Sequence, residues 1–241
     1  MPVGEPSKFQ GDQNLAEKHL EKLLRSFYRK PFEIHDYKEL ESITALADYY
    51  CALPAFSAFL YQILPHSLEL TAAIENDPNI FLVIAAKLRN ETLFTESLVH
   101  AVNPWHSPRF RTLKDRRLRD VAEMAHGRIS NLIMKGQEIV LYTQRNDASF
   151  REMHPSWTII TSVKGNDRVS WPRYIREMVN KLPYKDGRHK PLYQSCVALL
   201  EDNRMFNRYT HKAHEGALAE HILCAKIDKD EFPWDRAQTD Y

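Results

Sequence analysis

Apolar residues recur at helical spacing along most of the chain, and the spacing is clearest in residues 36–64. This pattern predicts two short helices that fold back on each other. Asp36 is expected to cap the first helix, with Glu39 completing a capping box, and Pro54 is expected to lie in the first turn of the second. The residues expected to form the buried faces of the pair are Tyr37, Leu40, Ile43, Leu46, Ala47, Tyr50, Phe56, Phe59, Leu60 and Ile63.

The same spacing predicts helices before and after this pair. We expect a first helix from Asp12 to the residue before Pro31, because a residue that precedes proline avoids the helical region. A short helix is expected at 68–74, and Asp77 and Asn90 are expected to precede two strongly apolar helices. The apolar face expected for the first helix consists of Leu15, Leu20, Leu23, Leu24, Phe27 and Tyr28.

The second half of the chain is patterned less evenly. A long helix is expected at about 111–145, in which Gly127 and Gly136 are candidate kinks because each weakens a helix by about 1 kcal/mol relative to alanine. Residues 146–172 lose the helical period, so 158–170 is expected to form either one small hairpin or a plain loop. Helical spacing returns in three further stretches, 174–182, 192–206 and 213–226.

These elements predict a mainly α fold of stacked antiparallel helical hairpins, since short connections between apolar-striped helices favour antiparallel neighbours. The changes in pattern divide the chain into three regions, 12–64, 65–145 and 146–241.

Composition and charge narrow the class of protein. An apolar fraction of 43% and a charged fraction of 27% are typical of a soluble globular protein, and a net charge of +1 argues against a dedicated nucleic-acid binder. The 7 glycines are not spaced as a phosphate-binding loop requires. The 3 cysteines lie far apart, which indicates reduced thiols and an intracellular protein, cytoplasmic or nuclear. No stretch approaches the ~20 apolar residues that span a membrane.

The candidate metal ligands form two pairs with i, i+3 spacing, His211 with His214 and His221 with Cys224. Neutral imidazole and thiolate both bind zinc, and this spacing lets each pair face one ion. All four residues fall on one predicted helix, however, and one straight helix cannot surround a tetrahedral ion. A structural or surface role is therefore preferred, with a zinc site as the alternative, and no cofactor is expected.

No catalytic residues are predicted. Four scattered histidines, His100, His106, His126 and His154, have no partner residue in the sequence that would make any of them a general base. The sequence also lacks a nucleophile elbow and an HExxH motif. We therefore expect that the protein is not an enzyme.

Several other conspicuous side chains have ordinary structural interpretations. Asp115, Asp120 and Glu123 are expected to pair with neighbouring arginines on a helix surface. Trp105 and Trp157 are expected to pack in the core, because tryptophan is highly buried on average. Anchoring a protein interface is the alternative for both tryptophans.

The stretch LADYYCALPAFSAFL at 46–60 resembles the BTB/POZ family in the form found in fungal proteins. Tyr50 and Leu53 fall at an aromatic and an apolar position of that family's helical hairpin. The resemblance extends to LLRSFY at 23–28 and to three apolar residues that follow it, Ile34, Leu40 and Ile43.

A second segment, IAAKLR at 84–89 with the Leu93-Phe94 pair after it, resembles the helical extension that often follows the domain in fungal members. The resemblance covers about residues 20–142. It implies that 12–64 corresponds to the last helices of a BTB domain and that 65–145 corresponds to the extension.

The resemblance implies a protein–protein interaction module, a scaffold or adaptor whose partners include a cullin-type ubiquitin ligase. A complete domain of this family begins with strands and a helix that need about 60 residues, whereas 19 residues precede Leu20. We therefore expect a truncated or divergent member. The alternative is a metal- or nucleic-acid-associated regulatory protein that uses the 211–224 cluster and the basic residues of 109–119.

Overall fold

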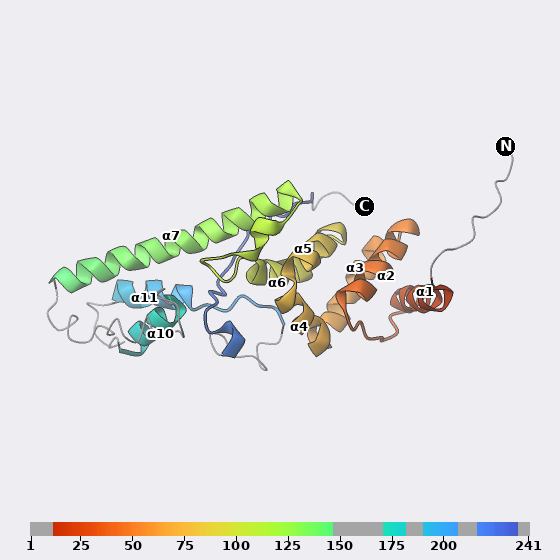
Figure 1. Ribbon diagram of the computed structural model, residues 1–241, viewed down its shortest axis with the longest axis horizontal. Helices are drawn as coiled ribbons and strands as arrows, with labels where there is room; N and C mark the ends of the chain where they lie inside the picture. The colour runs from red at the N-terminus through yellow and green to blue at the C-terminus, as the bar shows by residue number, and fades with distance from the viewer. Residues whose placement is uncertain (1–11, 147–170, 182–189, 207–215, 236–241) are drawn as a thin grey trace.

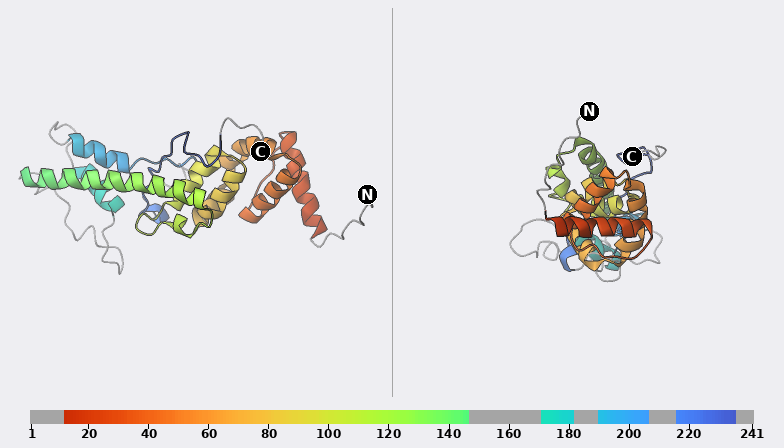
Figure 2. Two further views of the ribbon diagram at one scale, coloured as in Figure 1. Left: turned by 90° about the horizontal axis from the view of Figure 1, so that it is seen from above. Right: turned by 90° about the vertical axis from the view of Figure 1, so that its right-hand side faces the viewer.

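The computed structural model describes residues 12–146, 171–181, 190–206 and 216–235. Within these ranges the chain forms α-helices and short 3-10 helices but no β-strand, so the predicted mainly α fold is confirmed. The helices follow one another along an elongated molecule, from α1 at one end to the far end of α7 at the other (Figure 1). The end-on view in Figure 2 shows α1 lying across the end of the stack.

The α-helices are α1 (Gln13–Phe27), α2 (Tyr37–Tyr49), α3 (Leu53–Ile63), α4 (Leu68–Asn76), α5 (Pro78–Lys87), α6 (Glu91–Ala101), α7 (Arg116–Asn146), α10 (Trp171–Lys181) and α11 (Lys190–Leu199). Short 3-10 helices are η1 (Leu64–His66), η2 (Arg109–Thr112) and η4 (Gly216–Leu218). The helix α7 lies along α11, and α10 packs against α11 (Figure 1).

Polar side chains begin the helices largely where the sequence predicts. The carboxylate of Asp36 accepts a hydrogen bond from the backbone N–H of Glu39 at 2.8 Å, and the amide of Asn90 caps α6 in the same way. The carboxylate of Glu39 accepts from the N–H of His35 at 3.0 Å, one residue before the cap, so the capping box is displaced by one residue. Asp77 precedes α5 as predicted but makes no side-chain capping bond.

The predicted helical pair at 36–64 corresponds to α2 and α3, and most of its expected apolar face is confirmed. Fully buried members are Leu40, Ile43, Ala47, Phe56, Phe59 and Leu60. Tyr37, Leu46 and Ile63 are only half-buried. The prediction for Tyr50 is wrong, because its side chain is 54% exposed just beyond the end of α2.

The apolar face predicted for α1 is also largely wrong. Leu23 is buried and Leu20 half-buried, but the side chains of Leu15, Leu24, Phe27 and Tyr28 are exposed. In their place His19 and Ser26 are turned inward, and the Ser26 hydroxyl donates to the carbonyl of Leu23 at 2.6 Å. The helix contacts α2 and α3 along one side only, which leaves its apolar outer side in solvent.

Helix α7 begins later than predicted. Residues 109–112 form η2, and Asp115 then accepts from the backbone N–H groups of Arg117 and Leu118, which starts α7 at Arg116. Neither Gly127 nor Gly136 interrupts the helix, which runs for 31 residues. The hairpin or loop predicted at 158–170 lies outside the described residues. No helix in the described ranges combines the length and apolarity needed to cross a bilayer.

Two predicted C-terminal helices are corrected by the structure. The stretch 192–206 is helical only to Leu199, and within 213–226 the described residues form η4 and then continue without helix. Residues 222–225 are all buried, whereas a helix at the surface would leave one of its sides exposed. Burial of four consecutive side chains therefore explains why this stretch is not a surface helix.

Buried polar side chains of α6 and its C-terminal end fasten these non-helical segments to the helical stack. The side-chain amide of Asn103 donates to the carbonyl of Ile222 and accepts from its N–H, both at 2.9 Å. The carboxylate of Glu96 accepts from the N–H groups of Met205 and Phe206. The polar backbone that enters the core is thereby satisfied, as burial requires.

Candidate interaction groove

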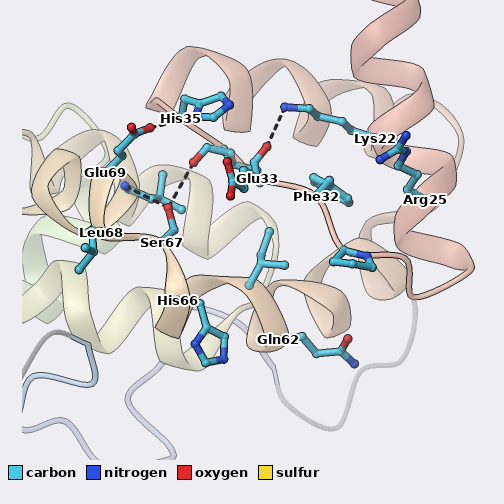
Figure 3. A pocket seen from close by; sticks show the side chains of 14 residues that line it. Lys22, Arg25, Phe32, Glu33, His35, Gln62, His66, Ser67, Leu68 and Glu69 are labelled. Carbon is cyan, nitrogen blue, oxygen red and sulfur yellow. Dashed lines mark hydrogen bonds and ion pairs between the residues drawn. The ribbon is translucent and has the colours of Figure 1, made fainter.

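A groove of about 760 Å³ lies between α1 and the α3–α4 region (Figure 3). Its walls come from three separate parts of the chain: α1, the non-helical connection at 31–35, and the residues that join α3 to α4. Its lining residues are Lys22, Arg25, Pro31, Phe32, Glu33, Ile34, His35, Gln62, Ile63, His66, Ser67, Leu68, Glu69 and Leu70.

The connection at 31–35 alternates between buried and exposed side chains, as a β-strand does. Phe32 and Ile34 are buried, whereas Glu33 and His35 are exposed. The ring of Phe32 stacks on Phe59 of α3 with centroids 4.9 Å apart. This alternation turns Phe32 and Ile34 into the core and leaves Glu33 and His35 at the surface.

The carbonyl groups of Glu33 and Ile34 accept hydrogen bonds, whereas the N–H groups of residues 32–34 have no acceptor in the described residues. Lys22 Nζ donates to the carbonyl of Glu33 at 2.7 Å, and the hydroxyl of Ser67 donates to that of Ile34 at 3.3 Å. Among the described residues, no acceptor takes a hydrogen bond from the backbone N–H of Phe32, Glu33 or Ile34. Unpaired N–H groups on an extended segment form a template for another strand.

Charged side chains hold the C-terminal end of the segment, at His35, in place. Lys22 forms an ion pair with Glu39, the residue that also accepts from the N–H of His35. Burial disfavours ionisation of Glu39, but the hydrogen bonds from Lys22 and His35 outweigh it and lower the pKa of Glu39 below its ordinary value of 4.5. At the same end the His35 ring lies 2.9 Å from the carboxylate of Glu69 (Figure 3).

The candidate metal ligands are not brought together within the part of the chain that the structure describes. His211 and His214 lie outside the described residues, and His221 is half-buried. Cys224 is buried, and burial raises the pKa of its thiol to about 11, which disfavours the thiolate that zinc requires. The described residues contain no group of three or more histidine, cysteine or acidic side chains placed to hold a metal ion.

The scattered histidines occupy unrelated environments. His100 is buried, with its Nε2 3.5 Å from the Glu96 carboxylate, and His106 is exposed. His126 bonds to the carbonyl of Trp105 at 2.9 Å. His154 lies outside the described residues.

The two candidate tryptophans have different outcomes. Trp105 is half-buried against the core and donates from its indole N–H to Ser130 at 3.1 Å, as expected for a packed tryptophan. Trp157 lies outside the described residues.

The charged residues near the start of α7 serve mainly structural contacts. Arg116 lies 3.7 Å from Asp120, the surface pairing that the sequence predicts, but Asp115 caps the helix instead of pairing with an arginine. Arg119 donates to the carbonyl of Leu113 at 3.2 Å, and Arg109 donates to carbonyl groups at the end of α4. A cation is favoured at that end of a helix, so Arg109 has a role in the fold.

The groove itself is a feature that reasoning from the sequence missed. The available signal was the alternation of apolar and polar residues at 32–35, directly after Pro31, which is typical of a short edge strand. The opposite wall, at Ser67 and Leu68, gives no comparable signal, because it is placed there only by the packing of α3 and α4.

Comparison with known proteins returns no match: no family model, no curated protein and no solved structure is similar to this chain.

Proposed function

We propose that the protein is a protein–protein interaction module that binds an extended segment of a partner in the groove beside residues 31–35. The observation that carries this proposal is that the backbone N–H groups of Phe32, Glu33 and Ile34 meet no acceptor in the described residues, and that Glu33 among them is exposed next to a partly apolar hollow. Adding a strand to such a segment satisfies these groups, and the groove walls then receive the alternate side chains of the partner.

Exposed apolar side chains beside the segment support binding to a protein. Leu68, at the start of α4, is 60% exposed and lines the groove. Ile63, which is half-buried, also lines the groove and adds apolar contact area. An exposed apolar surface of this kind, rimmed by Lys22 and Glu69, is typical of interaction sites.

The proposed function matches the class that the BTB/POZ resemblance implies, a scaffold or adaptor. Membership of that family and a cullin-type ligase as partner are part of the same proposal. A co-precipitation experiment with cullin-type ligases tests the partner. Recovery of a ligase with the wild-type chain and its loss from a Leu68→Asp chain would identify it as the groove ligand.

The groove is tested by affinity capture with matched surface variants. A Leu68→Asp chain places a carboxylate in the groove wall, and a Leu141→Asp chain makes the same change at a 66% exposed leucine on α7. We expect one set of proteins to be retained by the wild type and by Leu141→Asp but lost from Leu68→Asp. Equal retention by all three chains would contradict the groove as the binding site.

The strand-addition mode is tested on the segment of a captured partner that binds. Glu33→Pro removes one backbone donor, whereas Glu33→Ala shortens the same exposed side chain and keeps the donor. We expect the Kd of the segment to rise about tenfold for Glu33→Pro, the equivalent of one hydrogen bond, and to change less for Glu33→Ala. Circular dichroism must show equal helicity for both chains.

A further inference from the structure

Residues 226–235, which we call the strap, pass over a surface formed by α6 and α7. Phe232 and Trp234 of the strap pack on the buried ring of Phe94, with centroid separations of 5.6 and 5.3 Å. The two strap rings also contact each other at 4.8 Å. Phe94 is fully buried, and these two half-buried rings are part of its cover.

A single arginine of α7 holds the acidic part of the strap. Arg128 donates to both carboxylate oxygens of Glu231, to Asp228 at 3.3 Å and to the carbonyl of Lys226 at 3.0 Å. The hydrogen bond from Arg128 lowers the pKa of Glu231, because it favours the ionised form. Phe94 and Arg128 together, which we call the seat, therefore contact an aromatic pair and a carboxylate that directly precedes it in sequence.

The strap is attached more weakly than the residues that precede it. Residues 222–225 are all buried, and Asn103 pairs with both backbone groups of Ile222. No residue of 226–235 is buried, and its contacts include the hydrogen bonds of Arg128, the pairing of Lys226 with Glu201 and three half-buried apolar side chains, Ile227, Phe232 and Trp234. Segments with few buried contacts open locally at a small fraction of the global free energy of unfolding.

We infer that the seat is a binding site for an acidic–aromatic segment of another protein, and that the strap occupies this site within the same chain. The sequence DKDEFPWD at 228–235 shows the chemistry that the seat accepts: a carboxylate for Arg128, followed at once by aromatic rings for Phe94. Opening of the strap exposes a cation beside an apolar ring, a surface complementary in charge and shape to that sequence.

The strap suppresses binding of other segments because it is tethered next to the seat. A tethered ligand has a high effective concentration, so a free segment of equal chemistry competes poorly until the strap is weakened. The site lies on α6 and α7, away from the groove beside α1, and does not depend on the function proposed for that groove (Figure 1).

The experiment uses a fluorescein-labelled peptide of residues 226–235 and three full-length chains. Glu231→Ala weakens the strap and leaves the seat intact, whereas Arg128→Ala weakens the strap and removes the cation of the seat. We expect the peptide to bind Glu231→Ala at least about tenfold more tightly than the wild type in fluorescence anisotropy, and Arg128→Ala no more tightly than the wild type. A peptide with the same glutamate replaced by alanine is expected to lose binding to the Glu231→Ala chain.

A second strap variant keeps the test decisive. Phe232→Ala removes one ring of the strap without changing Arg128 or Phe94, and its expected effect on peptide binding has the same direction as that of Glu231→Ala. If neither variant binds the peptide more tightly than the wild type, or if Arg128→Ala gains as much as they do, the inference is overturned. Dimers of Glu231→Ala in light scattering would also overturn it, because the occupant would then be a second copy of the chain.

Discussion

Two extended segments of the molecule, residues 31–35 and residues 222–225, differ in how their backbone hydrogen bonds are satisfied. Side chains of 222–225 are all buried, and the backbone of Ile222 pairs with Asn103 on both its polar groups. In 31–35 only alternate side chains are buried, and the N–H groups of Phe32, Glu33 and Ile34 donate to no acceptor in the described residues.

The difference shows which extended segment is available to a partner. A segment that enters the core must satisfy its backbone, because an unpaired buried N–H costs about as much as a lost hydrogen bond. An exposed residue such as Glu33 can leave its N–H to water and exchange that contact for a partner's carbonyl group. The segment 222–225 therefore completes the fold, whereas 31–35 is suited to binding.

The largest loss of stability is expected from removing the Phe59 ring, which packs against residues 31–35. Phe59→Ala should lower the free energy of unfolding by about 3–5 kcal/mol, because Phe59 is buried and stacks on Phe32. Leu46→Ala, at a half-buried position on α2, should cost about half as much. Urea titrations measure both, and a loss below about 1 kcal/mol for Phe59→Ala would show that the ring is not part of the core.

The next largest loss of stability is expected at Asn103, whose side chain holds residues 222–225 through Ile222. Asn103→Ala leaves the buried N–H and carbonyl of Ile222 without their side-chain partner, which should cost about 2–4 kcal/mol. Asn146→Ala, at the exposed end of α7, is the matched control and should change stability by less than about 0.5 kcal/mol. Equal stability of the two variants would mean that Asn103 does not fasten the C-terminal segment.

Much of the fold follows from local sequence, because helix starts depend on neighbouring residues. Asp36 and Asn90 cap the helices that follow them, as the sequence predicts. The stretch 213–226 is different: its apolar spacing predicts a helix, but Asn103, 119 residues earlier, pairs with Ile222 and holds it extended. A contact over that separation leaves no local signal, so tertiary packing overrides the helical pattern.

Neither the buried face of α1 nor the groove could be predicted from the local sequence. Apolar residues extend around more of α1 than one packing surface can bury. The positions of α2 and α3 decide that Leu23 is buried and Leu24 exposed. The groove needs three separate segments to meet. Only the alternation at 32–35 was available in the sequence to indicate one of its walls.

A smaller effect on stability is expected from acidification, through Glu39 at the His35 end of residues 31–35. The pKa of Glu39 is lowered in the folded state, so its ionised form stabilises the fold above about pH 4.5. This contribution is lost as the pH falls through the lowered folded value. Glu39→Gln should therefore be less stable than the wild type at pH 7 and lose less stability between pH 5 and pH 3 in urea titrations. Parallel pH profiles for the two chains would show that Glu39 does not hold the segment.

The smallest effect is expected on the exposed side of α1. Leu24→Ser should change the free energy of unfolding by no more than about 0.5 kcal/mol, because its side chain lies largely in solvent. The adjacent Leu23→Ser should be strongly destabilising, since Leu23 is 1% exposed. A large loss for Leu24→Ser in the same urea titration would place the apolar outer side of α1 in a contact that the described residues do not show.

Amide hydrogen exchange resolved to single residues compares the two extended segments most directly. We expect the amides of Phe32, Glu33 and Ile34, which have no acceptor in the described residues, to exchange rapidly, and the amide of Ile222, bonded to Asn103, to be protected close to the level of the core helices. Protection of the amides at 32–34 equal to that of Ile222 would mean that these groups already have acceptors, and it would contradict a free binding edge.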